Sequence, residues 1–316
     1  MIPVWKQDFP TQTFEIVSAE LPSGSAWLVN CLLELDVSIW NPWDVEIPHE
    51  WSRKSQFQYT YKESKGMWCQ TLPALKKERS FNFDPCHSGR TTHRWPTTID
   101  EDKKILFFVR DPRDMLYSQW RRLSYNEPSF TMTFIAFLQS NYHHFPVNYV
   151  NYLCVFLTLW KARLKHLDYH VVRFEDYKSN ALETLKKALF FMGVMRTEKQ
   201  MLKAIKASDF KVVKQAEEKL AVQGKLIRKF NFTSQPLEYQ QHLDKQTSAL
   251  FDLAFNPICR WLGYESINVC DSTTSTSIKY TEDWSKTMVD CIYGDHYDPI
   301  NAKRLYQLFM NEFGLK

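Results

Sequence analysis

The chain has 316 residues, of which 15% are aromatic, so it is long enough to bury a sizeable core and disorder is excluded as its dominant state. Its net charge of +4 favours an anionic ligand, but Lys and Arg are too scattered to predict nucleic-acid binding. The seven cysteines never occur in CxxC spacing, which argues against a zinc site or a disulfide framework and favours a reducing compartment.

The apolar segments predict no membrane partner. Residues 1–10 (MIPVWKQDFP) lack the basic stretch and apolar run of a signal peptide. The longest apolar run, residues 152–160 (YLCVFLTLW), is too short to span a bilayer. We therefore expect a soluble, cytoplasmic protein.

The first elements in chain order are a strand, a loop and a helix. Residues 13–17 (TFEIV) are an expected strand, and residues 25–35 (SAWLVNCLLEL) are an expected helix. Residues 36–104 lack sustained periodicity and are rich in Trp, Pro, Lys and Ser, so we expect mostly irregular structure there.

The next elements continue the alternation. Residues 103–114 (KKILFFVRDPRD) predict a buried strand that ends in a turn, and a helix begins at 114–123. A long amphipathic helix is expected over 146–166, a strand over 169–177 and a further helix over 181–194. This order predicts an α/β fold in which helices cover both faces of a parallel sheet.

The C-terminal part is interpreted separately. Residues 270–277 (CDSTTSTS) are a low-complexity stretch typical of a linker, and residues 300–316 predict a terminal helix. We expect one domain over 1–264 and an extension over 265–316, which would act as a lid, as a contact in a homo-oligomer or as packing.

The loop SAELPSGSAWL (18–28) has features of an anion site. Gly24 allows close approach, Ser23 and Ser25 offer hydroxyls, and the following helix directs its N-terminal N–H groups to the same point. An ordinary turn with an N-cap is the alternative. The GxxxxGK[ST] pattern of a nucleotide kinase is absent, because the loop has one glycine and no lysine.

Arg110 and Ser118 suggest a second anion contact. Arg110 ends the expected strand at 103–114, and Ser118 lies in the first turns of the next helix, so a cation and a hydroxyl face the same side. The alternative is a capped helix with a surface ion pair among four charged side chains, namely Arg110, Asp111, Arg113 and Asp114.

These stretches resemble the sulfotransferases that use 3′-phosphoadenosine-5′-phosphosulfate (PAPS). LPSGSAWLVNCLLEL resembles their 5′-phosphosulfate loop, and VRDPRDMLYSQW resembles their 3′-phosphate motif, with Arg110 and Ser118 at the matching separation. VVRFEDYKSNALETLKKALFFMGV is similar to their strand, acidic pair and helix. LIRKFNF, PLEYQQHLDKQ and RWLGY resemble their C-terminal segment. The four blocks stand in the family's order over about residues 13–264.

The resemblance implies a three-layer, P-loop-NTPase-like fold and a role for each matching residue. The 5′-phosphosulfate would be held by Ser23, Gly24, Ser25, Ala26 and Trp27. The 3′-phosphate would be held by Arg110, Ser118, Arg228 and Lys229. Ser208 would contact adenine, with Phe210 and Trp27 on the two faces of the base; for both rings, ordinary core packing is the alternative.

The chain departs from the family at several positions. Pro22 and Thr91 stand where many relatives have lysine. His93, in TTHRWP, matches the family's general base, with His87 as a second candidate. The cations that would replace the lysines are Arg90 and Arg94. Two further departures are Phe174, where many relatives have tyrosine, and Phe230, where they have glycine.

The sequence therefore predicts sulfuryl transfer from PAPS to a hydroxyl or amine, with adenosine 3′,5′-bisphosphate (PAP) as product and without a metal ion. The acceptor is expected to be a small molecule, in particular a secondary metabolite. It would bind among tryptophans at 40, 43, 51, 68 and 95. A non-catalytic protein that binds PAP or PAPS is the alternative, and a nucleotide kinase is a weaker third hypothesis.

Overall fold

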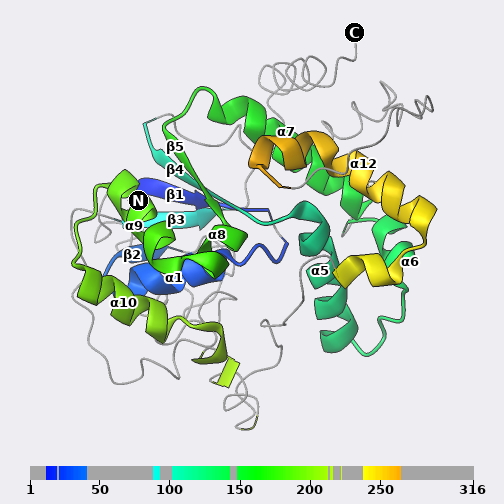
Figure 1. The fold of residues 1–316 in the computed structure, drawn as a ribbon, viewed down its shortest axis with the longest axis horizontal. Helices are drawn as coiled ribbons and strands as arrows, with labels where there is room; N and C mark the ends of the chain where they lie inside the picture. The colour runs from blue at the N-terminus through cyan, green and yellow to red at the C-terminus, as the bar shows by residue number, and fades with distance from the viewer. Residues whose placement is uncertain are drawn as a thin grey trace, which may run out of the picture. The chain divides into compact units, whose positions relative to one another are not determined.

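A computed structural model describes residues 12–19, 21–40, 88–92, 102–142, 148–212, 214–215, 222 and 238–264. These residues fall into two compact units. Among the described residues, the first unit contains a β-sheet and the helices that follow β1 and β5, and the second is built from helices (Figure 1).

The first unit is organised around a five-stranded sheet in which every strand pairing is parallel. Its strands are β1 (Gln12–Val17), β2 (Ser38–Trp40), β3 (Ser88–Thr92), β4 (Lys104–Val109) and β5 (Tyr169–Arg173), in the spatial order β2-β3-β1-β4-β5. β1 is central, and its Ile16 pairs with Thr91 of β3 and with Leu106 of β4. The residues that follow β1, β4 and β5 therefore emerge at the same edge of the sheet.

The strands follow the predicted pattern in part. β4 is buried from Ile105 to Val109, as expected for a continuous apolar run in the middle of a parallel sheet. Residues 36–104 were expected to be mostly irregular, but the described part of this segment includes β2 and β3. Both are short strands, and the three-residue β2 gives little periodicity to detect.

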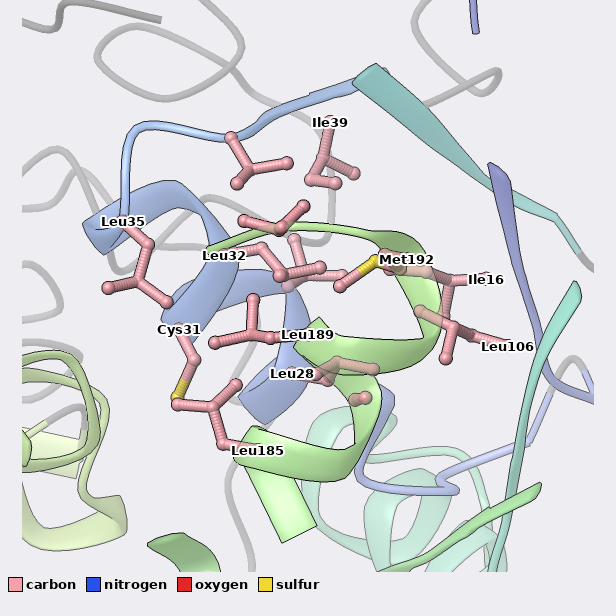
Figure 2. Close-up of a cluster of buried hydrophobic side chains, with 14 of the residues drawn as sticks. Ile16, Leu28, Cys31, Leu32, Leu35, Ile39, Leu106, Leu185, Leu189 and Met192 are labelled. Atoms are coloured by element: carbon pink, nitrogen blue, oxygen red, sulfur yellow. The ribbon is translucent and has the colours of Figure 1, made fainter. Parts of the chain in front are cut away.

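A hydrophobic core joins the sheet to α1 (Ser25–Glu34) and α9 (Ala181–Met192). Ile16 and Leu106 enter this core from the sheet, and Leu189 and Met192 enter it from α9 (Figure 2). Each of these side chains is almost fully buried, which stabilises the fold by about 1.5–3 kcal/mol per side chain. The core thus fixes α1, and with it the loop that precedes α1, against the sheet.

The ends of the neighbouring helices are set by local signals. Gly193 has a φ of 78°, and the N–H of Val194 donates to the carbonyl of Leu189 over 2.9 Å, which ends α9 at Met192, two residues before the predicted end. α10 (Glu198–Ala207) begins after Thr197, whose side chain forms a capping box. α10 packs against α1.

One predicted strand is too long. Residues 169–177 were expected to be a strand, but β5 ends at Arg173 and α8 (Phe174–Ser179) begins directly after it. Glu175 and Asp176 lie in the first turn of α8, where the helix dipole favours negative charge. Arg173 also donates from Nε to Asp176 Oδ2 over 3.0 Å, and this contact favours the helical turn.

The second unit contains four α-helices and one 3₁₀-helix among the described residues. They are α5 (Pro112–Asn126), α6 (Phe134–Gln139), α7 (Tyr149–Leu164), η4 (Glu238–His242) and α12 (Lys245–Leu262). α5 begins two residues before the predicted start, because Asp111 caps it and Pro112 occupies its first position. α7 is buried at most positions rather than amphipathic, because it packs against α5, α6 and α12.

The predicted linker at 270–277 and the predicted helix at 300–316 lie outside the described residues, so the boundary at 264 stays a prediction. Within the described part of the chain, none of the helices combines the length and apolar character needed to cross a membrane.

Candidate functional site

The loop between β1 and α1 turns at Gly24, the N-cap of α1. Its φ of 86° and ψ of 5° lie in the left-handed region, which glycine adopts without strain. A Cβ at Gly24 would lie 2.3 Å from Cδ2 and 2.6 Å from Cε2 of the Phe174 ring. Glycine is therefore needed here for the turn and for the close approach of α8.

Three serine hydroxyls gather in this loop. Ser23 Oγ donates to Ser25 Oγ over 3.0 Å, and Ser25 Oγ lies 3.3 Å from Ser18 Oγ. All three serines are buried, and Ala26 follows in the first turn of α1. Hydroxyl donors beside the positive end of a helix dipole suit a negatively charged group.

Arg110 directly follows β4 and is buried. Its guanidinium Cζ lies 4.8 Å from the ring centroid of Phe174, which is a cation–π contact. Phe174 is the first residue of α8 and follows the end of β5. One aromatic ring thus packs against both the glycine of the serine loop and the arginine that follows β4.

Trp27 packs against a ring that the sequence analysis did not single out. Its indole stacks on Tyr177 of α8, with ring centroids 4.0 Å apart and an interplanar angle of 17°. Trp27 is only 5% exposed, and partial burial contributes to raising the pKa of Tyr177 to about 12. Tyr177 therefore covers one face of Trp27, and the expectation that Trp27 stacks on a base stays a prediction.

Lys178 follows Tyr177 on α8 and completes an aromatic cluster. Its Nζ lies 5.5 Å from the ring centroid of Phe174, 5.4 Å from that of Tyr177 and 5.5 Å from that of Phe210. Partial burial lowers the pKa of Lys178; the charge of Asp209 opposes this effect and the charge of Arg110 adds to it. Tyr177 and Lys178 were not among the predicted site residues, because the strand was expected to continue to residue 177.

Ser208 and Phe210 differ in their access to solvent. Ser208 is the C-cap of α10, is 3% exposed and lies beside the thiol of Cys31. Burial raises the pKa of Cys31 to about 12, and the contact with Ser208 opposes this in part. Phe210 is half-buried, so its ring remains reachable from solvent.

The charged residues around the start of α5 do not form the surface ion pair that was the alternative interpretation. Arg110, Asp111, Arg113 and Asp114 are all buried. Because charges are buried only when they are paired or hydrogen-bonded, this cluster contributes to structure or to binding rather than to solubility.

Arg113 is the centre of a buried network in the second unit. It donates from Nη2 to Asp111 Oδ2 over 2.6 Å and from Nη1 to Asp252 Oδ1 over 2.9 Å. Tyr239 also donates to Asp252 Oδ1 over 2.8 Å. Burial alone would lower the pKa of Arg113, but hydrogen bonding to Asp111 and its charge raise it, so the guanidinium stays charged. This network ties the start of α5 to α12.

Ser118 lies on α5 and is buried. The preceding residue, Tyr117, donates its hydroxyl hydrogen to Glu238 Oε1 over 3.0 Å, and the hydroxyl oxygen lies 2.9 Å from Nε2 of His242. Burial and the interaction with Glu238 raise the pKa of Tyr117 to about 12. These contacts fix the face of α5 next to Ser118 against η4.

Several predicted site residues lie outside the described residues, so their roles stay predictions. They are His87, His93, Arg94, Arg228 and Lys229. Arg90 lies in β3. Among the described residues, no group of three or more His, Cys, Asp or Glu side chains is placed to hold a metal ion.

Comparison with known proteins gives one family match. The family model of the sulfotransferase domain matches residues 23–263, well over half of the chain. No curated protein matches the sequence.

The solved structures that share the fold include two that contain PAP. A mouse sulfotransferase complexed with PAP is 17% identical, with a TM-score of 0.52, and the match covers 79% of this chain and 85% of that chain. A retinol dehydratase in complex with retinol and PAP is 13% identical, with a TM-score of 0.50, and the match covers 80% of this chain and 82% of that chain. These structures confirm the predicted α/β, P-loop-NTPase-like fold with a parallel sheet flanked by helices. On the match to the family model, which spans most of its length, the chain belongs to the sulfotransferase family.

Proposed function

We propose that this protein binds PAPS and transfers its sulfuryl group to a hydroxyl or amine of a small-molecule acceptor, with PAP as the second product. The observation that carries the proposal is the meeting of the serine loop and Arg110 at the ring of Phe174. This arrangement offers hydroxyl donors and a cation at the same edge of the sheet. Membership of the sulfotransferase family supports it, as does the presence of PAP in both structural neighbours.

The residues assigned to the nucleotide suit its charged groups. Gly24 allows the left-handed turn that leads into α1, and the buried hydroxyls of Ser23 and Ser25 are suitable donors. The residues that would hold the 5′-phosphosulfate are therefore Ser23, Gly24, Ser25, Ala26 and Trp27. The residues that would hold the 3′-phosphate are Arg110, Ser118, Arg228 and Lys229.

The aromatic residues would hold the base. Phe210 is half-buried and lies beside Lys178, so an adenine ring has an accessible partner there. Trp27 and Ser208 are assigned to the base by family resemblance. Tyr177 already covers one face of Trp27, so only its other face is left for a base in this arrangement.

PAPS, when bound, supplies an activated sulfuryl group. The serine hydroxyls and the N-terminal N–H groups of α1 would donate to the phosphate oxygens, where charge grows as the sulfuryl group leaves. His93 would accept the proton of the attacking hydroxyl or amine, because a neutral imidazole with a pKa near 6.5 accepts protons at neutral pH. We assign Arg90 and Arg94, in place of lysine, to stabilise the charge on the oxygen that joins phosphorus to sulfur in PAPS.

The acceptor class rests on the sequence alone. Trp43, Trp51, Trp68 and Trp95 lie outside the described residues, and Trp40 belongs to β2. Aromatic walls favour a flat or cationic small molecule. We propose a secondary metabolite as the natural acceptor.

A non-catalytic PAP- or PAPS-binding protein is the second candidate function. The observation that favours it concerns the two positions where many relatives have lysine. Pro22 is uncharged, and Thr91 is uncharged and 2% exposed. A protein of this kind would bind PAP tightly and form no sulfated product.

Calorimetry with PAP and mass spectrometry of reactions with PAPS separate the two functions. We expect PAP binding together with sulfated products from a panel of phenols, alcohols and amines. His93→Ala should slow transfer by about 100-fold or more and leave PAP affinity unchanged, because it removes the base but no nucleotide contact. His166→Ala, which removes an exposed histidine, is the matched control.

Each outcome has a distinct meaning. PAP binding without product from any acceptor would support the non-catalytic function. Absence of PAP binding would contradict both candidates. Transfer at the normal rate by His93→Ala would remove His93 from the mechanism and leave the proposed reaction in place.

A further inference from the structure

Lys178 has surroundings that ordinary surface lysines lack. It is exposed, yet its ammonium lies within 5.5 Å of the ring centroids of Phe174, Tyr177 and Phe210. Three rings around one cation hold the ammonium in place and still leave it accessible. A ligand that approaches these rings would therefore meet a positioned positive charge.

The ring of Phe174 is shared by two cations. Arg110 lies 4.8 Å from its centroid and Lys178 lies 5.5 Å from it. The two charges are close enough for Arg110 to lower the pKa of Lys178. Two like charges held around one ring repel each other, and a bound anion would relieve this repulsion.

The acidic neighbour of Lys178 does not neutralise it by direct contact. Asp209 acts on Lys178 through its charge, but among the described residues Lys178 forms no ion pair. Asp209 is itself exposed, and its carboxylate accepts from the backbone N–H of Lys211 over 2.8 Å. The positive charge of Lys178 is thus available to a ligand.

We propose that Lys178 is a further nucleotide-binding residue, which acts with Arg110 on the 3′-phosphate of PAP and PAPS and so sets the preference for a 3′-phosphorylated nucleotide. This inference rests on the proposed function. A phosphate monoester carries nearly two negative charges at neutral pH, so two cations match it better than one. The serine loop has a different role, because it contacts Phe174 through Gly24 and is assigned to the 5′-phosphosulfate.

The test compares two nucleotides that differ only in the 3′-phosphate, namely PAP and adenosine 5′-monophosphate. Affinities are measured by calorimetry for the wild type, Lys178→Met and Lys178→Arg. We expect Lys178→Met to weaken PAP binding by about 10- to 100-fold, the effect of one charged hydrogen bond. Binding of adenosine 5′-monophosphate should stay unchanged, and Lys178→Arg should retain most of the affinity for PAP.

The matched control is Lys186→Met, which removes the same charge from an exposed position on α9. Lys186→Met should leave the affinities for both nucleotides unchanged. If Lys186→Met and Lys178→Met weakened PAP binding equally, the effect of Lys178 would come from the net charge of the protein and the inference would be overturned. Equal losses for both nucleotides in Lys178→Met would mean that Lys178 only supports the aromatic cluster, and would overturn the inference. Unchanged PAP affinity would overturn it as well.

The wild-type measurements test the proposed function separately. If the wild type binds PAP and Lys178→Met binds it equally well, only the role of Lys178 fails. If the wild type does not bind PAP, the proposed function fails and this inference fails with it. Circular dichroism of each variant checks that the fold is intact.

Discussion

Replacing Gly24 by alanine should lower the free energy of unfolding for two separate reasons. A side chain at a φ of 86° costs about 1–2 kcal/mol, because the left-handed region brings Cβ close to the backbone. The new Cβ would also overlap the Phe174 ring, at a distance of 2.3 Å, and overpacking of this kind costs about 1–3 kcal/mol. We therefore expect Gly24→Ala to lower the free energy of unfolding by about 2–5 kcal/mol.

A double-mutant cycle with Phe174→Ala separates the two costs. In the Phe174→Ala background the overlap with the ring is absent, so Gly24→Ala should lower the free energy of unfolding only by the backbone strain. The interaction energy between the two substitutions should therefore be about 1–3 kcal/mol. Gly193→Ala, at a φ of 78°, is the control for strain. Urea titrations followed by circular dichroism give each free energy of unfolding. If Gly24→Ala costs the same with and without the Phe174 ring, the close approach of α8 to the loop is refuted.

Two further predictions concern the second unit. Arg113→Met removes the guanidinium from two buried carboxylates, those of Asp111 and Asp252, and should lower the free energy of unfolding by about 3–5 kcal/mol in urea titrations. The exposed Arg260→Met should change it by less than about 0.5 kcal/mol, and equal effects of the two changes would argue against the buried network. The folded-state pKa of Tyr117 is raised from 10.0 to about 12, so its contribution to stability is complete below pH 10 and is lost as the pH rises through about 12. Tyr117→Phe should therefore reduce the loss of stability between these pH values, and an unchanged alkaline unfolding profile would show that another group titrates there.

Local patterns were enough to predict the serine loop and Arg110. The loop joins a strand to a helix, and both elements have clear hydrophobic patterns on either side of Gly24. Arg110 follows an uninterrupted apolar run, so the end of β4 was also visible in the sequence. The order of strands and helices then predicted the parallel sheet, because such alternation requires crossover connections.

Contacts between distant segments were not predictable in this way. In the sequence, Phe174 stands out only as a departure from the family, whereas the structure places it against Gly24 and Arg110. Tyr177 was assigned to the expected strand over 169–177 and Lys178 to no element, whereas both belong to α8, where they contact Trp27 and Phe210 respectively. These interactions depend on tertiary packing, which local propensity does not encode.

The central position of β1 has a consequence for local opening. Because β3 and β4 flank it on both sides, its backbone amides are expected to exchange with solvent only when the sheet itself opens. The serine loop is thus anchored to one of the most protected parts of the first unit. The short α8 has no fully buried residue and packs against the core through the partly buried rings of Phe174 and Tyr177. We therefore expect α8 to open transiently more often than β1, while the loop at β1 keeps its shape.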